Sequence, residues 1–353
     1  MMKNSKIRRL FVLCLPLLMV AFAACEHRPL EDPYNMHYVR VYIDEQIKNV
    51  TYGFYDESRL RPEYIRPRVM RVALCDPITN KVVVERYLQT TGEDERGYYI
   101  DGYISAEEGA YNLMIYNFGT EKTKIRDEYN YSGIQAYTSQ IPKNYHQYIP
   151  MSSVDIAEEA IRYCPDHLFV ANCQPVKVRK SVGLDTLRNQ DGDFFTARSI
   201  VLSYYLQIKI KGFNYVSTAV SLLSGMAGST TLSDCTLNKN DAVSIFFDMD
   251  YADVQRTKNE DKETAILYAT FNTFGKLPEE RSLYTVNFEF NKSDGTSQVE
   301  TIDITPMFFD NPQVVNEQWI ILEKEIEISP PIGSGGMTPG VDEWGDIWTD
   351  IYL

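Results

Sequence analysis

Apolar and polar side chains alternate one by one along most of this chain. The pattern is clearest in four segments, whose apolar positions are Val39, Val41 and Ile43; Leu206, Ile208 and Ile210; Val243, Ile245, Phe247 and Met249; and Tyr284, Val286, Phe288 and Phe290. A period of two is that of a β-strand with one buried face, and such strands are typical of antiparallel sheets. After Phe290 comes Asp294-Gly295, a favoured hairpin turn. The pattern predicts an all-β protein.

One segment departs from this alternation. Residues 152–166, SSVDIAEEAIRYCPD, have the spacing of a short helix, with Asp155 as its cap, Glu158 three residues later and Pro165 at its end. The strand pattern before it and the strand pattern after it are each long enough for one domain. We therefore expect two tandem antiparallel β-sandwich domains, at 37–165 and 166–332.

The N-terminus has the composition of a secretory signal. Residues 1–24 combine a basic start with an apolar run that is too short to span a bilayer comfortably. The run ends in Phe22-Ala23-Ala24-Cys25, which resembles a bacterial lipobox. We predict that Cys25 becomes the acylated first residue of the mature chain, carrying palmitate-like chains, with residues 25–36 as its tether. Three acyl chains make such an anchor effectively permanent.

The mature chain is strongly acidic. Removal of the leader leaves 31 Lys and Arg against 49 Asp and Glu, a net charge of −18. This charge argues against nucleic acid and against anionic lipid surfaces as partners.

Four cysteines remain after Cys25, namely Cys75, Cys164, Cys173 and Cys235. Their spacing contains no C-x-x-C pair, so we expect no zinc site. Disulfides are permitted in an envelope compartment, and Cys164–Cys173 is the most local candidate, but free buried thiols fit the sequence equally well.

The sequence offers no convergent catalytic or cofactor site. Its four histidines lack metal-pair spacing, and we expect a surface or tether role for His27 and His37, which lie in the N-terminal lead. Nucleophile-elbow, zincin and Walker motifs are absent. Asp191 and Asp193 form only half of a calcium-loop pattern, which favours a solvated turn. We predict a protein that is not an enzyme and needs no cofactor.

The 25 tyrosines are mostly explained by strand propensity. The group from Tyr129 to Tyr148 lies in a turn-rich segment and remains a candidate ligand surface, because aromatic side chains bind sugars and proteins alike.

The chain ends in a glycine-rich linker and a strand-like segment, at 333–353. In the last segment Ile347, Ile351 and Leu353 share one parity, while Trp348 lies on the other and Trp344 precedes both. Such a strand needs a partner, because an unpaired apolar edge aggregates. It either forms a final edge strand of its own second domain or is donated to another subunit. The linker from Gly333 to Gly336 favours donation.

Four stretches resemble the fimbrillin-like lipoproteins of Bacteroides and Porphyromonas, in the branch of anchor and accessory subunits. They are Cys25-Glu26-His27-Arg28, VSLLSGMAGSTTLS at 220–233, ATFNTFG at 269–275, and GGMTPGVDEWGDIWTDIYL at the end. The resemblance implies two transthyretin-like sandwiches, outer-membrane lipidation with surface exposure, and assembly of fimbriae by strand exchange. In stalk subunits of that family, a protease cuts after an arginine and removes the first strand. The neighbour's C-terminal strand then fills the groove.

Arg28 and Arg40 are the arginines nearest the first predicted strand, although neither has a specific cleavage pattern around it. Together these features predict an outer-membrane fimbrial anchor or accessory subunit that contributes to cell adhesion. The alternative is a surface glycan-binding lipoprotein that uses its tyrosines. A lipid-anchored enzyme is the third and weakest interpretation.

Overall fold

The computed structural model describes residues 35–45, 65–117, 119–142, 159–171, 175–180, 184–256, 262–277 and 283–331. The signal and tether residues before 35, the arginine Arg28 and the whole segment 333–353 lie outside this described part. Within the described part the regular elements are strands apart from three short helices, as the alternation predicted. No helix of this part is long and apolar enough to cross a bilayer.

The first domain is a ten-stranded sheet in the order β3-β2-β6-β10-β13-β1-β5-β4, with β11 beside β6 and β12 beside β1. Its strands are β1 (Met36–Asp44), β2 (Met70–Cys75), β3 (Val82–Leu88), β4 (Thr90–Asp94), β5 (Gly97–Ser105), β6 (Gly109–Asn117), β10 (Phe169–Ala171), β11 (Pro175–Val178), β12 (Asp185–Thr186) and β13 (Phe195–Ser199). The sheet curls so that β3 also contacts β5. Its inner face holds a core that includes Val39, Val41 and Ile43, as the sequence predicted.

The second domain is a sandwich of two sheets, β18-β19-β14-β22 and β21-β20-β15-β17-β9. Their bounds are β9 (Ala160–Tyr163), β14 (Leu202–Lys211), β15 (Val216–Ala227), β17 (Ala242–Asp248), β18 (Asp250–Arg256), β19 (Glu263–Thr273), β20 (Thr285–Lys292), β21 (Ser297–Asp303) and β22 (Trp319–Glu327). Three short helices, η4 (Phe213–Tyr215), α2 (Thr305–Asp310) and α3 (Pro312–Glu317), connect these described strands. Phe247 of β17 stacks on Phe271 of β19 between the sheets, with ring centroids 4.0 Å apart.

The four alternating segments predicted from the sequence are strands, and their apolar positions face the cores. The turn at Asp294-Gly295 joins β20 to β21, and Gly295 adopts a φ of 80° that favours glycine. Thr285, Asn287 and Glu289, on the opposite face of β20, are also buried, so this strand is covered on both sides.

The predicted helix at 152–166 is wrong in the part that the structure describes. Ala160–Tyr163 forms β9, which pairs in parallel with β17 from Val243 to Phe246. Arg162 fixes it there, because its guanidinium donates to the carbonyls of Thr138 and Gly228 and binds Asp241 at 2.8 Å. Long-range pairing has overridden a local helical pattern.

The sheets do not divide at residue 165. Strands β10 to β13 follow that residue in the chain yet complete the first sheet, whereas β9 precedes it and joins the second domain. The chain therefore enters the second domain once, returns to finish the first sheet, and leaves it for good between β13 and β14.

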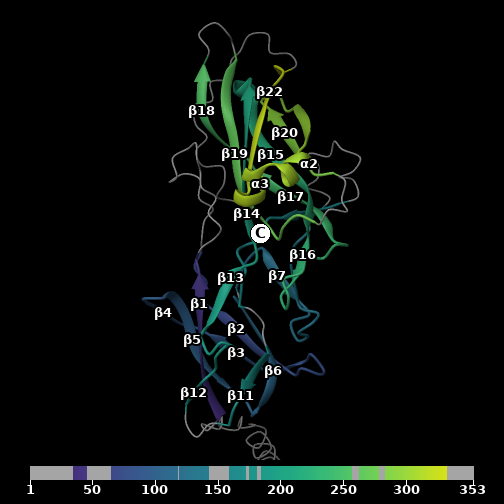
Figure 1. The fold of residues 1–353 in the computed structure, drawn as a ribbon. Helices are drawn as coiled ribbons and strands as arrows, with labels where there is room; N and C mark the ends of the chain where they lie inside the picture. Colours follow the sequence, from purple (N-terminus) through teal and green to yellow (C-terminus); the bar gives the residue numbers. More distant parts are fainter. Residues whose placement is uncertain are drawn as a thin grey trace, which may run out of the picture.

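A third, three-stranded sheet connects the domains. It contains β7 (Thr123–Arg126), β8 (Gln135–Thr138) and β16 (Ser229–Thr231), in the order β16-β8-β7. Beside it lies an interdomain cluster of buried residues from both domains. Its members are Ala73, Cys75, Met114, Tyr116, Ile134, Ala136, Leu168, Val170, Val201, Ala227, Leu232, Phe274 and Leu277. Figure 1 shows the two domains stacked end to end about this junction.

Candidate functional site

The first strand, β1, is the element on which the sequence-based hypothesis of strand exchange depends. It lies inside the first sheet rather than at an edge. On one side it pairs antiparallel with β5, from Met36 opposite Ser105 to Tyr42 opposite Tyr99. On the other side it pairs in parallel with β12 and β13. Removing β1 would therefore leave hydrogen-bonding groups of β5, β12 and β13 unpaired, because each ladder loses its partner.

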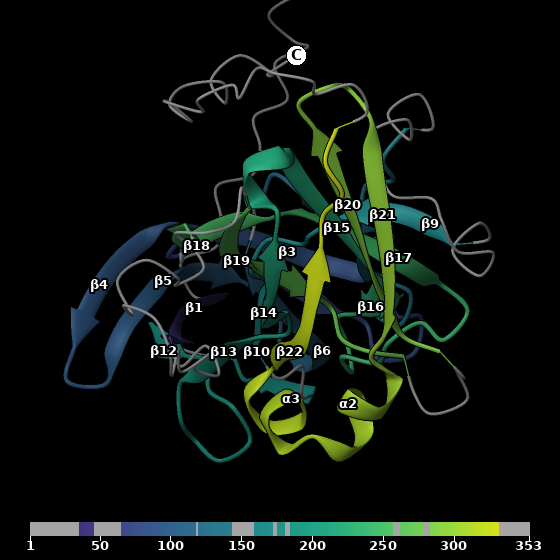
Figure 2. The ribbon, with the colours of Figure 1, turned by 90° about the horizontal axis from the view of Figure 1, so that it is seen from above.

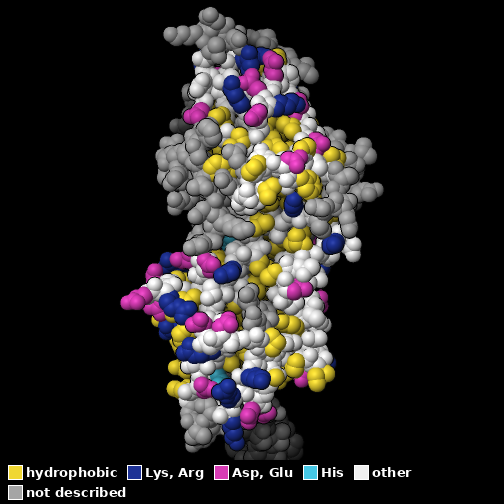
Figure 3. Space-filling model, in the orientation of Figure 1, with side chains coloured by type: hydrophobic (Ala, Val, Ile, Leu, Met, Phe, Trp, Pro, Cys, Tyr) yellow, Lys and Arg dark blue, Asp and Glu magenta, His cyan; other side chains and the backbone are white. Residues whose placement is uncertain are grey.

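The outer face of β1 carries Tyr38, Arg40 and Tyr42, since these positions alternate with the buried Val39 and Val41. The register places Arg40 directly opposite Asp101 and Tyr42 opposite Tyr99. In the space-filling view, charged side chains of both signs gather on the flank of the lower domain that β4 and β5 form (Figure 3).

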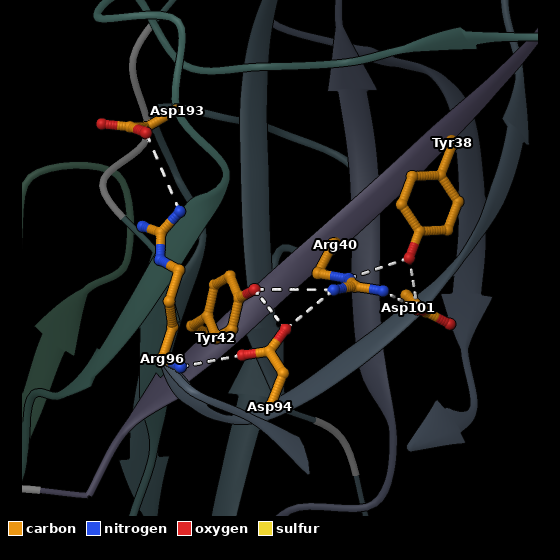
Figure 4. Close-up of polar contacts among 7 residues, drawn as sticks. All are labelled: Tyr38, Arg40, Tyr42, Asp94, Arg96, Asp101 and Asp193. Atoms are coloured by element: carbon orange, nitrogen blue, oxygen red, sulfur yellow. Dashed lines mark hydrogen bonds and ion pairs between the residues drawn. The ribbon is translucent and has the colours of Figure 1, made fainter. Parts of the chain in front are cut away.

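Arg40 is the centre of a polar network on this face (Figure 4). Its guanidinium contacts Asp94 at 3.0 Å and Asp101 at 3.3 Å, and its Nε donates to the Tyr38 hydroxyl at 2.9 Å. The hydroxyls of Tyr38 and Tyr42 donate in turn to Asp101 and Asp94. One side chain of β1 is thereby bonded to both β5 and β4. We call Tyr38, Arg40, Tyr42, Asp94, Tyr99 and Asp101 the Arg40 cluster.

The ring of Tyr99 packs against the guanidinium of Arg40. The Arg40 guanidinium carbon lies 3.7 Å from the ring centroid of Tyr99, a close cation–π contact. Tyr99 can lie there because its cross-strand neighbour on β4 is Gly92, where a Cβ would come within 2.4 Å of the ring. Gly92 thus leaves room for the Tyr99 ring that contacts the Arg40 guanidinium.

Burial and hydrogen bonding shift the protonation of this cluster. Burial, followed by the hydrogen bond to Asp101, raises the pKa of Tyr38 to about 12. The hydrogen bond from Tyr42, aided by the nearby Arg40 and Arg96, lowers the pKa of the Asp94 carboxyl. At neutral pH the carboxylate of Asp94 is therefore charged and the phenol of Tyr38 is neutral, which are the forms that the bonds require.

The cluster is suited to holding strands together, not to chemistry. Each charged group in it is bonded to another member, so no side chain is left as an unengaged base or nucleophile. An open hollow beside it, at the end of β1, is lined by Tyr42, Glu45, Arg96 and Thr196 among others. Among the described residues no group of His, Cys, Asp and Glu could hold a metal ion.

Of the site residues predicted from sequence, the structure describes only Arg40, which the Arg40 cluster holds within β1. Cys25, Arg28 and the tail residues Trp344, Ile347, Trp348, Ile351 and Leu353 lie outside the described residues. Sequence reasoning noted Arg40 as an arginine near the first strand and missed its partners. The Tyr-x-Arg-x-Tyr alternation of β1 was a visible signal, but the register with β5 was not.

The prediction for His37 is wrong. His37 is only 1% exposed, because its position on β1 has the same parity as the core residues Val39 and Val41. Asp191 and Asp193 do lie in an exposed turn, where their backbone N–H groups donate to Asn189 Oδ1. Cys75, Cys164 and Cys235 are free thiols, and Cys173 lies outside the described residues.

The amino-acid sequence of this chain is similar to those of known proteins. Residues 87–248 match a family model described as "Domain of unknown function (DUF5119)". A "Putative fimbrium anchoring subunit Fim4B" of Bacteroides ovatus is 26% identical over 371 residues, which cover 98% of this chain and 97% of that protein.

A solved structure shares the fold. A crystal structure of a "putative adhesin" from Bacteroides ovatus has a TM-score of 0.52 at 21% identity, covering 87% of this chain and 98% of the other. The fimbrial anchor protein Mfa2 of Porphyromonas gingivalis has a TM-score of 0.46 at 11% identity, over 83% of this chain and 90% of its own. The resemblance expected from the sequence is confirmed: along almost its whole length, this chain is similar to a protein described as a "Putative fimbrium anchoring subunit".

Proposed function

We propose that this chain is a lipid-anchored end subunit of a fimbrium, which keeps its first strand and joins the next subunit through its C-terminal segment. The observation that carries the proposal is the position of β1, which is paired on both sides and fixed by the Arg40 cluster. The full-length similarity to a described anchoring subunit supports the same role.

Neither candidate arginine gives a protease a route to removing β1. Arg40 lies in the middle of the strand, paired with Asp101 of β5, and the residues that follow it, from Val41 to Asp44, pair with β13 as well. A protease needs an extended peptide that it can pair with itself. Cleavage after Arg28 would leave β1 in place, because the strand begins at Met36. A groove for a donor strand would therefore not open at this position.

A subunit that can donate a strand but cannot accept one belongs at the end of a polymer. An internal subunit needs both a groove and a donor segment, since each junction uses one of each. Acylation at Cys25 would place this end at the outer membrane. The same logic requires Arg28 to stay uncut, because a cut there would separate the acylated cysteine from the folded domains.

The test is the state of the native N-terminus. In cells, Cys25→Ser should release the protein from the membrane fraction and abolish acyl labelling, because the anchor is the lipid alone. Intact mass of the wild-type protein should correspond to a chain that begins at an acylated Cys25. Membrane retention of Cys25→Ser, or a mass that begins after Arg28 or Arg40, would contradict the proposal. Cys235→Ser, an exposed cysteine in the second domain, is the matched control and should stay in the membrane fraction.

A further inference from the structure

Two exposed tyrosines lie beside a buried arginine on the first domain. Tyr87 of β3 pairs directly opposite Arg71 of β2, so their side chains share one face of the sheet. In the turn between β7 and β8, the ring centroid of Tyr129 lies 5.5 Å from the guanidinium carbon of Arg71. Tyr87 is 42% exposed and Tyr129 is 67% exposed, whereas Arg71 is fully buried.

Two carboxylates belong to the same group. Glu85 has the parity of Tyr87 on β3, and its Oε2 accepts two bonds from Arg71, one of them from Nε at 3.1 Å. Glu128 binds Arg71 at 3.3 Å, also through Oε2. Among the described residues the other oxygen of each carboxylate has no bonding partner, and both side chains are partly exposed. We call Tyr87, Tyr129, Glu85 and Glu128 the tyrosine–carboxylate surface.

Backbone bonds fix this surface in place. The turn that carries Tyr129 lies along the end of the β2–β3 turn, because the Val82 N–H donates to the Tyr129 carbonyl at 3.2 Å. The guanidinium of Arg71 also donates to the backbone carbonyl of Glu128 at 3.2 Å. Tyr129 is therefore exposed and yet held on a fixed turn. A surface that is ordered in advance loses less conformational entropy when it binds.

The chemistry of this surface fits a neutral ring that carries hydroxyl groups. Carboxylate oxygens only accept hydrogen bonds, so they require a ligand that donates, as neighbouring hydroxyls do. The exposed tyrosine rings can cover the C–H side of such a ring while their own hydroxyls stay in water.

The local charge does not favour an ionic ligand. An incoming cation would meet Arg71, which already binds both carboxylates, and an incoming anion would meet the carboxylates themselves. Acidic and basic side chains in the surface and its flanks are equal in number, namely Glu85, Asp127 and Glu128 against Arg71, Lys81 and Arg86.

We propose that the tyrosine–carboxylate surface binds a neutral carbohydrate. A pyranose ring stacks on Tyr129, and its hydroxyls donate to the unengaged oxygens of Glu85 and Glu128. Arg71 is a positioning residue, because it orients both carboxylates from within the protein. The site goes beyond the proposed anchor role and does not depend on it.

This site takes one residue from the tyrosine group that the sequence offered as a ligand surface. Tyr129 belongs to the site, whereas Tyr131 packs against the interdomain cluster. Tyr145 and Tyr148, at the end of that group, lie outside the described residues.

A glycan array probed with the mature chain carrying Cys25→Ser tests the class of ligand. The array holds neutral oligosaccharides that end in hexoses, deoxyhexoses or N-acetylhexosamines, together with sialylated and sulfated oligosaccharides. Neutral glycans should bind and acidic ones should not, because two carboxylates border the surface. Binding to no neutral glycan would overturn the proposal.

Variants test the site, with the neutral glycan that binds most strongly on the array as the probe in calorimetric titration. Tyr129→Ser should lower the affinity about tenfold because ring stacking is lost, whereas Tyr129→Phe should retain it. Glu128→Gln should lower it several-fold, since an amide oxygen is a weaker acceptor than a carboxylate. The matched control is Tyr251→Ser, at a 38% exposed tyrosine of β18 on the flank of the second domain (Figure 2), which should bind as wild type does.

Unchanged glycan affinity in Tyr129→Ser and Glu128→Gln, with native circular dichroism spectra, would place the sugar elsewhere and overturn the proposal. If Tyr129→Ser kept its glycan affinity but was lost from purified fimbriae, the surface would be a contact between subunits instead. The binding measurements use the unacylated chain, so their outcome is separate from that of the anchor proposal.

Discussion

Arg71 shows how much a single residue connects in this molecule. It is fully buried on β2, yet its guanidinium binds Glu85 of β3, the hydroxyl of Tyr116 on β6, and Glu128 in the turn before β8. A buried cation needs such partners, because desolvation of an unpaired charge is costly. The partners come from elements of the first sheet and from the turn that leads to the connecting sheet. Arg71 therefore fixes the β7–β8 hairpin to the first domain.

Arg71→Met should destabilise the protein by about 3 kcal/mol, the lower end of the range for breaking a buried ion pair. The lower end is expected because Glu85 and Glu128 are 34% and 32% exposed and can be hydrated again. The measurement is the free energy of unfolding in urea. Arg86→Met, an exposed arginine on the neighbouring strand, should change it by less than about 0.5 kcal/mol. Equal effects of the two changes would mean that Arg71 is not held as described.

At the scale of elements, β1 is the strand whose attachment decides the assembly hypothesis. Its inner face is fixed by core packing and its outer face by the Arg40 cluster, so the two faces respond to different conditions. Core packing is insensitive to mild acid, whereas the bonds to Asp94 require the ionised carboxylate.

Acid should weaken the outer attachment of β1 through Asp94. Its folded-state pKa is lowered, chiefly by the hydrogen bond from Tyr42. Its contribution to stability is therefore full above the unfolded pKa of about 4 and is lost as the pH falls through the folded pKa. Asp94→Asn should be less stable than wild type at neutral pH, and the difference should vanish in strong acid. Urea midpoints across this range measure it, with the exposed neighbour Glu95→Gln as a control. A constant difference at all pH values would contradict this role of Asp94.

The C-terminal segment is the second element that matters for assembly. Deletion of Val341–Leu353 should leave the protein folded, with the wild-type melting temperature, but should remove it from purified fimbriae, because the neighbouring subunit would lose the donated strand. Circular dichroism and mass spectrometry of fimbriae are the two measurements. Unfolding of the truncated chain would show that the segment is a strand of the protein's own second domain. Continued co-purification would show that assembly uses another surface.

At the scale of the whole molecule, the two domains share a buried boundary. The interdomain cluster contains buried residues from both domains. The chain also crosses the boundary more than once, because β9 lies in the second domain while β10 to β13 lie in the first. Neither domain can unfold without exposing apolar surface of the other. We therefore expect the two domains to keep a fixed relative orientation rather than to move independently about a linker.

Thermal unfolding should therefore be a single transition in calorimetry, even though the chain has two domains. Phe274→Ala, within the interdomain cluster, should cost about 3–5 kcal/mol and should lower the one transition as a whole. Two resolved transitions in the wild-type protein would contradict this coupling. A matched control is Phe309→Ala, whose ring is partly exposed on α2 and whose loss should matter less.

What the sequence determined by itself was local. Alternation identified β1, β14, β17 and β20 together with the face that each buries, because strand parity is a property of neighbouring residues. The Asp294-Gly295 turn was equally local. The resemblance of short motifs to fimbrial lipoproteins was confirmed by the full-length similarity.

The tertiary structure decided everything that depends on which strands meet. It turned a helical pattern at Ala160–Tyr163 into β9, returned β10 to β13 to the first sheet, and buried His37. It also set the register that puts Arg40 opposite Asp101 and places the guanidinium of Arg40 over the ring of Tyr99. Sequence could name Arg40 but not its acidic partners, because the two carboxylates that bind it lie more than fifty positions away and only pairing of β1, β5 and β4 brings them together.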